Sequence, residues 1–204
     1  MPSYPVHAVS LTCHPGTPGD PVRSVGARVC RMPDGVLAVT YILEGDLDRV
    51  RVPAPRPSRI AGRLSQHTCC EMFIARQGSP AYHEFNLSPS GEWAAYAFER
   101  YRDGAPLAGE WNEEELNPQV AVRAGAKKLE LDALIRLDRL SPIQSGARLS
   151  LALSAVIEDR GGLLSYWALK HPPGKPDFHH ADAFALELEW AGTAADPASP
   201  PSPA

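Results

Sequence analysis

The sequence predicts an all-β protein built as an antiparallel two-sheet β-sandwich. Twenty-one prolines and sixteen glycines divide the chain into short apolar runs. Within these runs apolar residues recur mostly at every second position, the period of a strand with one buried face, rather than at helical spacing. About ten or eleven such runs are present, enough for two sheets packed face to face.

The run YHEFNL shows the alternation residue by residue. Glu84 and Asn86 share one face with Tyr82, whereas Phe85 and Leu87 lie on the other face and are predicted to point into the core. Neighbouring runs are separated by Gly, Pro and Ser turns, which predicts hairpins. In chain order, we expect strands at residues 7–12, 26–31, 36–43, 69–75, 82–87, 93–98, 120–123, 129–137, 148–157, 164–168 and 184–190.

The length of 204 residues fits one domain, which we place at residues 1–190. Residues 191–204 consist almost entirely of Ala, Pro and Ser, with Gly, Thr and Asp. Such a composition cannot bury enough apolar surface to order itself, so we expect a disordered tail.

Charge and hydropathy exclude two classes of partner. The net charge of −4 gives no broad positive field for binding nucleic acid. No apolar run approaches the roughly 18 residues needed to span a bilayer. The start, MPSYP, lacks the basic and apolar parts of a secretory signal, so we expect a cytoplasmic protein.

An arginine-rich loop is expected between Gly45 and Gly62, because Pro53, Pro55 and Pro57 interrupt any regular structure there. One interpretation is a solvated loop. The other is that an arginine grips an anion or a pair of sugar hydroxyls. The arginines concerned are Arg51, Arg56 and Arg59 within the loop and Arg63 just beyond it.

The densest polar cluster lies in residues 166–180, where a strand end leads into a proline-stiffened loop. Aromatic and charged side chains together on such a loop are typical of the rim of a ligand site. The alternative is a stiff connection whose histidines hydrogen-bond main-chain carbonyls.

Metal binding and catalysis have weaker support. Histidines near 171–180, with His67, Cys69, Cys70 and Asp182, supply atoms suited to haem or a divalent metal, but their spacing matches no metal motif. No GxSxG elbow or glycine-rich phosphate loop is present. Glu71 and Glu84, on adjacent strands, have the chemistry of an acid/base pair, but exposed or hydrogen-bonded strand carboxylates are far commoner. We therefore expect a non-enzyme that needs no cofactor.

Three strings carry a family resemblance: HTCCEMFI at 67–74, YHEFNLSPSGEW at 82–93 and the loop 166–180. Together they resemble the bacterial DOMON-like proteins, a family similar to the family 9 carbohydrate-binding modules, over nearly the whole chain up to residue 190. The resemblance implies a jelly-roll-like sandwich with a binding site rather than an active site.

In family 9 modules a sugar lies between two tryptophans, and carboxylate, amide and cationic groups reach its hydroxyls. The resemblance places that carboxylate on Glu71 and the second tryptophan on Trp167, whereas the first falls on Ser65. Other DOMON relatives bind haem through Met and His.

We therefore predict a non-catalytic module that binds a saccharide or a related polar small molecule. The alternatives are a haem or metal protein using the histidines of the loop 171–180, and an adaptor that binds another protein. The predicted ligand-binding residues are Glu71, Glu84, Asn86, Trp167, His171, Lys175, His179 and His180.

Overall fold

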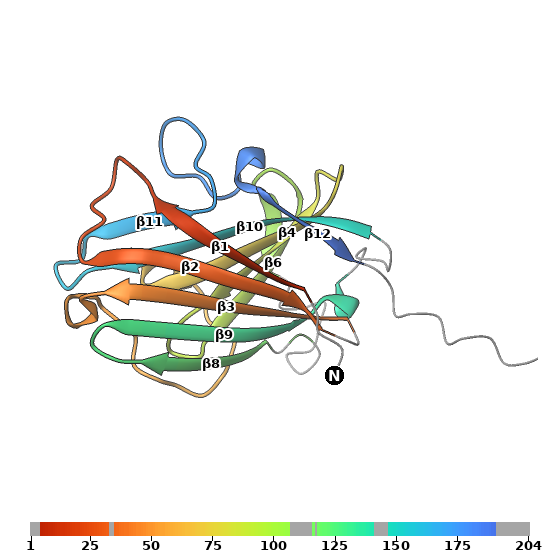
Figure 1. Cartoon of the computed structure of the whole chain (residues 1–204). Helices are drawn as coiled ribbons and strands as arrows, with labels where there is room; N and C mark the ends of the chain where they lie inside the picture. The colour runs from red at the N-terminus through yellow and green to blue at the C-terminus, as the bar shows by residue number, and fades with distance from the viewer. Residues whose placement is uncertain (1–4, 33–34, 107–115, 117, 141–146, 191–204) are drawn as a thin grey trace, which may run out of the picture.

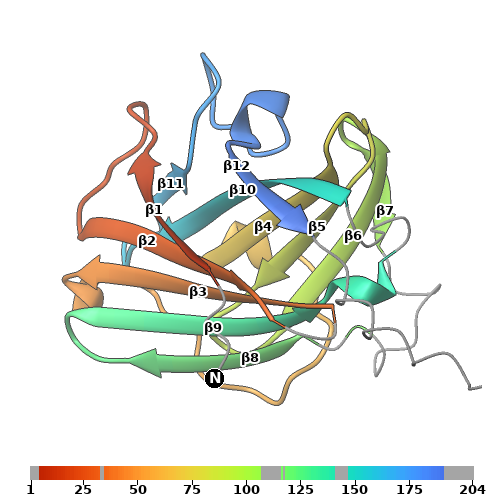
Figure 2. The same ribbon diagram turned by 45° about the vertical axis from the view of Figure 1, so that its right-hand side comes forward.

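The computed structural model of the chain describes residues 5–32, 35–106, 116, 118–140 and 147–190. The predicted tail at 191–204 lies outside these residues. Within them the strands form two layers, which Figures 1 and 2 show from two sides. One layer contains β1 (Val6–Cys13), β2 (Val22–Arg31), β3 (Val36–Gly45), β8 (Gln119–Ala124) and β9 (Lys128–Arg136).

The other layer contains the seven remaining described strands. Its order of hydrogen-bonded neighbours is β7-β6-β5-β4-β10-β11, with β12 pairing with β10 beside β11. The strands are β4 (Cys69–Arg76), β5 (Tyr82–Leu87), β6 (Trp93–Arg100), β7 (Asp103–Pro106), β10 (Ala147–Glu158), β11 (Leu164–Ala168) and β12 (Leu186–Trp190).

Strand β1 belongs to both layers. Its residues 6–11 pair with β2, and Thr12 and Cys13 pair with β11, so one hydrogen-bonded path of antiparallel strands folds over on itself. The prediction of an antiparallel β-sandwich is confirmed. Every predicted strand has a counterpart, and β7 is additional; its sequence DGAP carries Gly and Pro and is exposed throughout, so it gave no alternating pattern.

The core lies between the layers, where the predicted alternation holds. In β3 buried residues occupy every second position, and Phe85 and Leu87 of β5 are fully buried against them in the same cluster. Tyr41 of β3 crosses the core and donates a 2.6 Å hydrogen bond from its hydroxyl to the main-chain oxygen of Glu71 on β4. This bond ties the layers together at the position where the candidate site begins.

Strands β4 and β5 are buried on their outer faces too. Phe73 and Tyr82 pack there against Ala152, Phe178 and Ala183, in a second apolar cluster separate from the core. Phe178 and Ala183 belong to the segment 170–185, which therefore covers part of the outer face of this layer. This explains why residues 69–74 of β4 and all of β5 are buried continuously rather than at alternate positions.

Apart from residue 116, helical structure in the described residues is limited to short 3-10 turns. They span Leu47–Arg49, Leu64–Gln66, Leu137–Arg139 and Ala181–Ala183. In the part of the chain that the structure describes, no helix has the length and apolar character required to cross a membrane.

Candidate ligand-binding site

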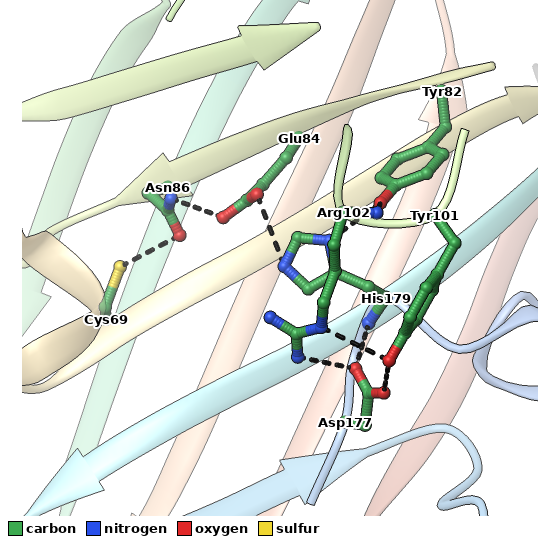
Figure 3. A network of polar contacts seen from close by, with 8 residues as sticks. All are labelled: Cys69, Tyr82, Glu84, Asn86, Tyr101, Arg102, Asp177 and His179. Carbon is green, nitrogen blue, oxygen red and sulfur yellow. Dashed lines mark hydrogen bonds and ion pairs between the residues drawn. The ribbon is translucent and has the colours of Figure 1, made fainter. Parts of the chain in front are cut away.

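A row of polar side chains crosses the outer face of the second layer (Figure 3). The amide nitrogen of Asn86 donates a 2.6 Å hydrogen bond to Glu84 Oε1, and the Cys69 thiol lies 3.9 Å from Asn86 Oδ1. At the other end of the row, Glu84 Oε2 lies 3.8 Å from Nε2 of His179. Strand parity places Glu84 and Asn86 on one face of β5, and the segment 170–185 brings His179 to them.

Beyond His179 the row continues to Tyr101, whose hydroxyl is held in place by hydrogen bonds. Tyr101 donates a 2.5 Å hydrogen bond from its hydroxyl to Asp177 Oδ2, and Arg102 donates a 2.8 Å hydrogen bond to Asp177 Oδ1. The main-chain N–H of Arg102 donates to the Tyr82 hydroxyl, which also lies 2.8 Å from His179 Nδ1. Figure 3 shows that these side chains converge on His179 from β5, the β6–β7 turn and the segment 170–185.

Two hollows flank this network. A cleft of about 770 Å³ is lined by Tyr82, Tyr101, His179, His180 and Phe184, together with the turn that follows β4. A smaller hollow of about 400 Å³ is lined by Arg102, Asp177, Lys175, His180 and neighbouring prolines. His180 lines both, so the two hollows are adjacent. The larger one falls in the size range of small-molecule sites, roughly 300–1,000 Å³.

Burial sets the protonation of the row. Desolvation raises the pKa of Glu84, although the hydrogen bond from Asn86 and the charge of Arg102 oppose the shift. Desolvation, with Arg102 nearby, lowers the pKa of His179 to about 4. At neutral pH the imidazole is therefore uncharged, and its contact with Glu84 is not an ion pair.

The structure brings together five of the predicted site residues. Glu84, Asn86 and His179 form the row, and Lys175 and His180 line the hollows. These residues lie close together because the segment 170–185 folds back over β5.

Glu71 lies on the same outer face but deeper. It pairs in register with Asn86 on one side and Ser154 on the other, and it is only 3% exposed. Its Oε1 and the Ser154 hydroxyl are buried without a hydrogen-bond partner among the described residues. Burial and the nearby Glu84 raise the Glu71 pKa well above the usual value, which favours the neutral form of the carboxyl.

Trp167 and His171 do not join this set. Trp167 pairs with Ala155, is 6% exposed and points into the core, where its indole N–H donates to Ser165 Oγ. The Trp167 ring is therefore not exposed as the predicted aromatic platform. Strand parity turns Tyr166 and Ala168 outward and Trp167 inward. His171 Nε2 lies 2.8 Å from the Thr12 main-chain oxygen, which anchors the loop to β1.

Sequence reasoning missed Tyr101, Arg102 and Asp177. Asp177 lies 75 residues from Arg102, so no local pattern links them. The only local signal was weak: Gly104 follows shortly after Tyr101 and Arg102. In the structure Arg102 has a φ of 56°, a conformation rare outside glycine, which the sequence did not indicate.

Metal ligands do not gather in the described residues. No group of three or more His, Cys, Asp or Glu side chains there could hold a metal ion.

The lowered pKa of His179 predicts a loss of stability in acid. Between the ordinary pKa of 6.5 and the folded value of about 4, the unfolded chain takes up a proton that the folded chain refuses. This contribution lowers the free energy of unfolding progressively as the pH falls from about 6.5 to 4, by up to about 3 kcal/mol. His179→Asn should flatten the dependence of Tm on pH in that window. An unchanged slope would mean that this imidazole is not the group responsible.

Comparisons with known proteins establish the fold. No family model matches the chain, and no curated protein matches it. A candidate carbohydrate-binding protein from Bacteroides uniformis matches with a TM-score of 0.64 and 15% identity, over 91% of this chain and 86% of that one.

Two structures of a family 9 carbohydrate-binding module from Caldicellulosiruptor kristjanssonii match as well. The complex with glucose has a TM-score of 0.51 and 13% identity, over 94% of this chain and 87% of that one. The complex with cellotriose has a TM-score of 0.52 and 14% identity, over 97% and 89%. The described part of the chain thus has the fold of carbohydrate-binding modules.

Proposed function

We propose that this protein is a non-catalytic, DOMON-like module that binds a saccharide or a related polar small molecule in the cleft beside Tyr101. The observation that carries the proposal is the state of Tyr101. The residue is 55% exposed, yet Asp177 and Arg102 fix its hydroxyl, and it lines a cleft of ligand size.

A fixed, exposed ring suits the apolar face of a pyranose, because the ring loses little entropy when the sugar stacks on it. Charged and neutral hydrogen-bonding groups stand around it, as hydroxyl recognition requires: His179 and His180 in the cleft, and Lys175 in the adjoining hollow. The fold shared with sugar-bound modules supports the same function.

The row behind His179 supports binding rather than catalysis. Glu84 is already hydrogen-bonded by Asn86, and Glu71 is buried and lines neither of the two hollows beside His180. The row therefore orients His179 from behind instead of presenting two carboxylates to one substrate.

The test is a titration calorimetry screen with monosaccharides and oligosaccharides, starting from glucose and cellotriose, with haemin as a separate ligand. Tyr101→Ala should weaken binding of the sugar about tenfold or more, whereas Tyr101→Phe should retain most of the affinity because the ring remains. Arg123→Gln, an exposed arginine in the other layer, is the control and should bind normally.

Sugar binding that survives Tyr101→Ala would place the site elsewhere. Binding of haemin alone, lost in His179→Ala, would replace the saccharide by haem.

A further inference from the structure

A second concave surface lies at the opposite end of β4, near His67 rather than Arg76. Its volume is about 570 Å³, and it lies between the proline-rich segment after the 3-10 turn Leu47–Arg49 and the turn that joins β5 to β6. The residues that line it include Arg51, Arg56, Arg59 and Arg63, the arginines of the loop singled out in the sequence. We refer to it as the arginine cleft.

Two buried carboxylates hold the wall of the arginine cleft. Glu158, whose side chain is 6% exposed, receives Arg51 at 2.9 Å on one oxygen and His67 at 2.8 Å on the other. Glu92 accepts two hydrogen bonds from Arg59 on Oε1 and one from the Ser90 hydroxyl on Oε2. Every oxygen of the two carboxylates is therefore occupied.

The cations outnumber these anions. Four guanidinium groups face two carboxylates, which leaves a formal surplus of two positive charges. Arg56 comes only within 3.7 Å of Glu92, beyond hydrogen-bonding distance, and the Arg63 side chain makes no ion pair or hydrogen bond among the described residues. Because each guanidinium carries five N–H donors, most donors of Arg56 and Arg63 are open to a ligand.

The main chain of the segment that carries these arginines is held in place. Pro53, Pro55 and Pro57 reduce the freedom of the segment that carries Arg56 and Arg59, and its main chain is hydrogen-bonded to the turn at Ser90 and to Trp93. The loop that carries the arginines is thus restrained, so it loses little conformational entropy when a ligand binds.

We propose that the arginine cleft binds a tetrahedral oxyanion, the phosphate or sulfate group of a small molecule. A dianion matches the surplus of two charges, and its oxygens can accept paired N–H donors from more than one guanidinium. This site is separate from the saccharide cleft, so either proposal can fail without affecting the other.

The proposal is tested by calorimetry with inorganic phosphate, sulfate, glucose 6-phosphate and glucose, each at the same ionic strength set with chloride. Phosphate and sulfate should bind, and the double variant Arg56→Gln/Arg63→Gln should weaken them about tenfold or more. Arg123→Gln is the matched control, since Arg123 is an exposed arginine paired with two carboxylates, Glu130 and Asp132, in the other layer. The Nε–Hε signals of the cleft arginines should shift on titration.

The two sources of the anion are separated by the sugar phosphate. Glucose 6-phosphate that binds more tightly than inorganic phosphate identifies a larger phosphorylated ligand, and equal affinities identify the free anion; both support the site. Absence of binding by every oxyanion at millimolar concentration overturns the proposal. So does an equal loss in Arg123→Gln, because that result would reflect overall charge alone.

Discussion

Glu71→Gln is expected to stabilise the protein at neutral pH. Burial and Glu84 raise the pKa of the Glu71 carboxyl well above its usual value, and its Oε1 has no partner among the described residues. The unfolded chain releases this proton at an ordinary pKa near 4.5, so the carboxyl lowers the free energy of unfolding as the pH rises through 4.5 towards the folded pKa. A neutral amide of the same shape removes that term.

We expect a gain of about 1–3 kcal/mol at pH 7.5, or a rise in Tm of roughly 3–9 °C. The gain should disappear below about pH 4.5, where the carboxyl is protonated in both states. Denaturant unfolding across this pH range measures it.

Glu92→Gln is the matched control with the opposite sign. Glu92 is also buried, but hydrogen bonds from Arg59 lower its pKa, so its charge stabilises the fold. Its amide variant should be less stable at neutral pH. If both variants lose stability, Glu71 is ionised and partnered in the native protein, and the proposed desolvation of its carboxyl is wrong.

Phe73→Ala should lower the free energy of unfolding and also abolish ligand binding. Phe73 is fully buried on the outer face of β4, and its ring lies 5.0 Å from the His179 ring and 6.3 Å from those of Tyr82 and Phe184. Truncation leaves a cavity under the segment 170–185, at a cost of about 3–5 kcal/mol. The segment that carries His179 and His180 then loses its anchor.

Phe85→Ala separates the two effects. Phe85 is equally buried and lies opposite Met72 on the next strand, but it faces the core. It should destabilise the protein by a similar amount while sugar affinity, measured well below the Tm, remains. Hydrogen exchange of residues 171–183 should rise in Phe73→Ala only. Equal exchange in both variants would contradict an anchoring role for Phe73.

The sequence by itself determined the strands and the parity of their side chains. Period-two alternation is a local property, so the buried positions of Phe85 and Leu87 and the shared face of Glu84 and Asn86 could be predicted from the run that contains them. The polar loop at 166–180 was also found, because proline and clustered polar residues are local signals.

Tertiary structure alone decided which of these residues meet. The burial of both faces of β4 and β5 depends on a segment about a hundred residues away in the chain, and the partnership of Tyr101 and Arg102 with Asp177 depends on the same fold-back. Parity within β11 turned Trp167 inward, although its sequence context suggested a ligand platform. Local patterns record which face a side chain occupies; which distant segment covers that face is set by packing of the whole chain, and this is where the candidate site arises.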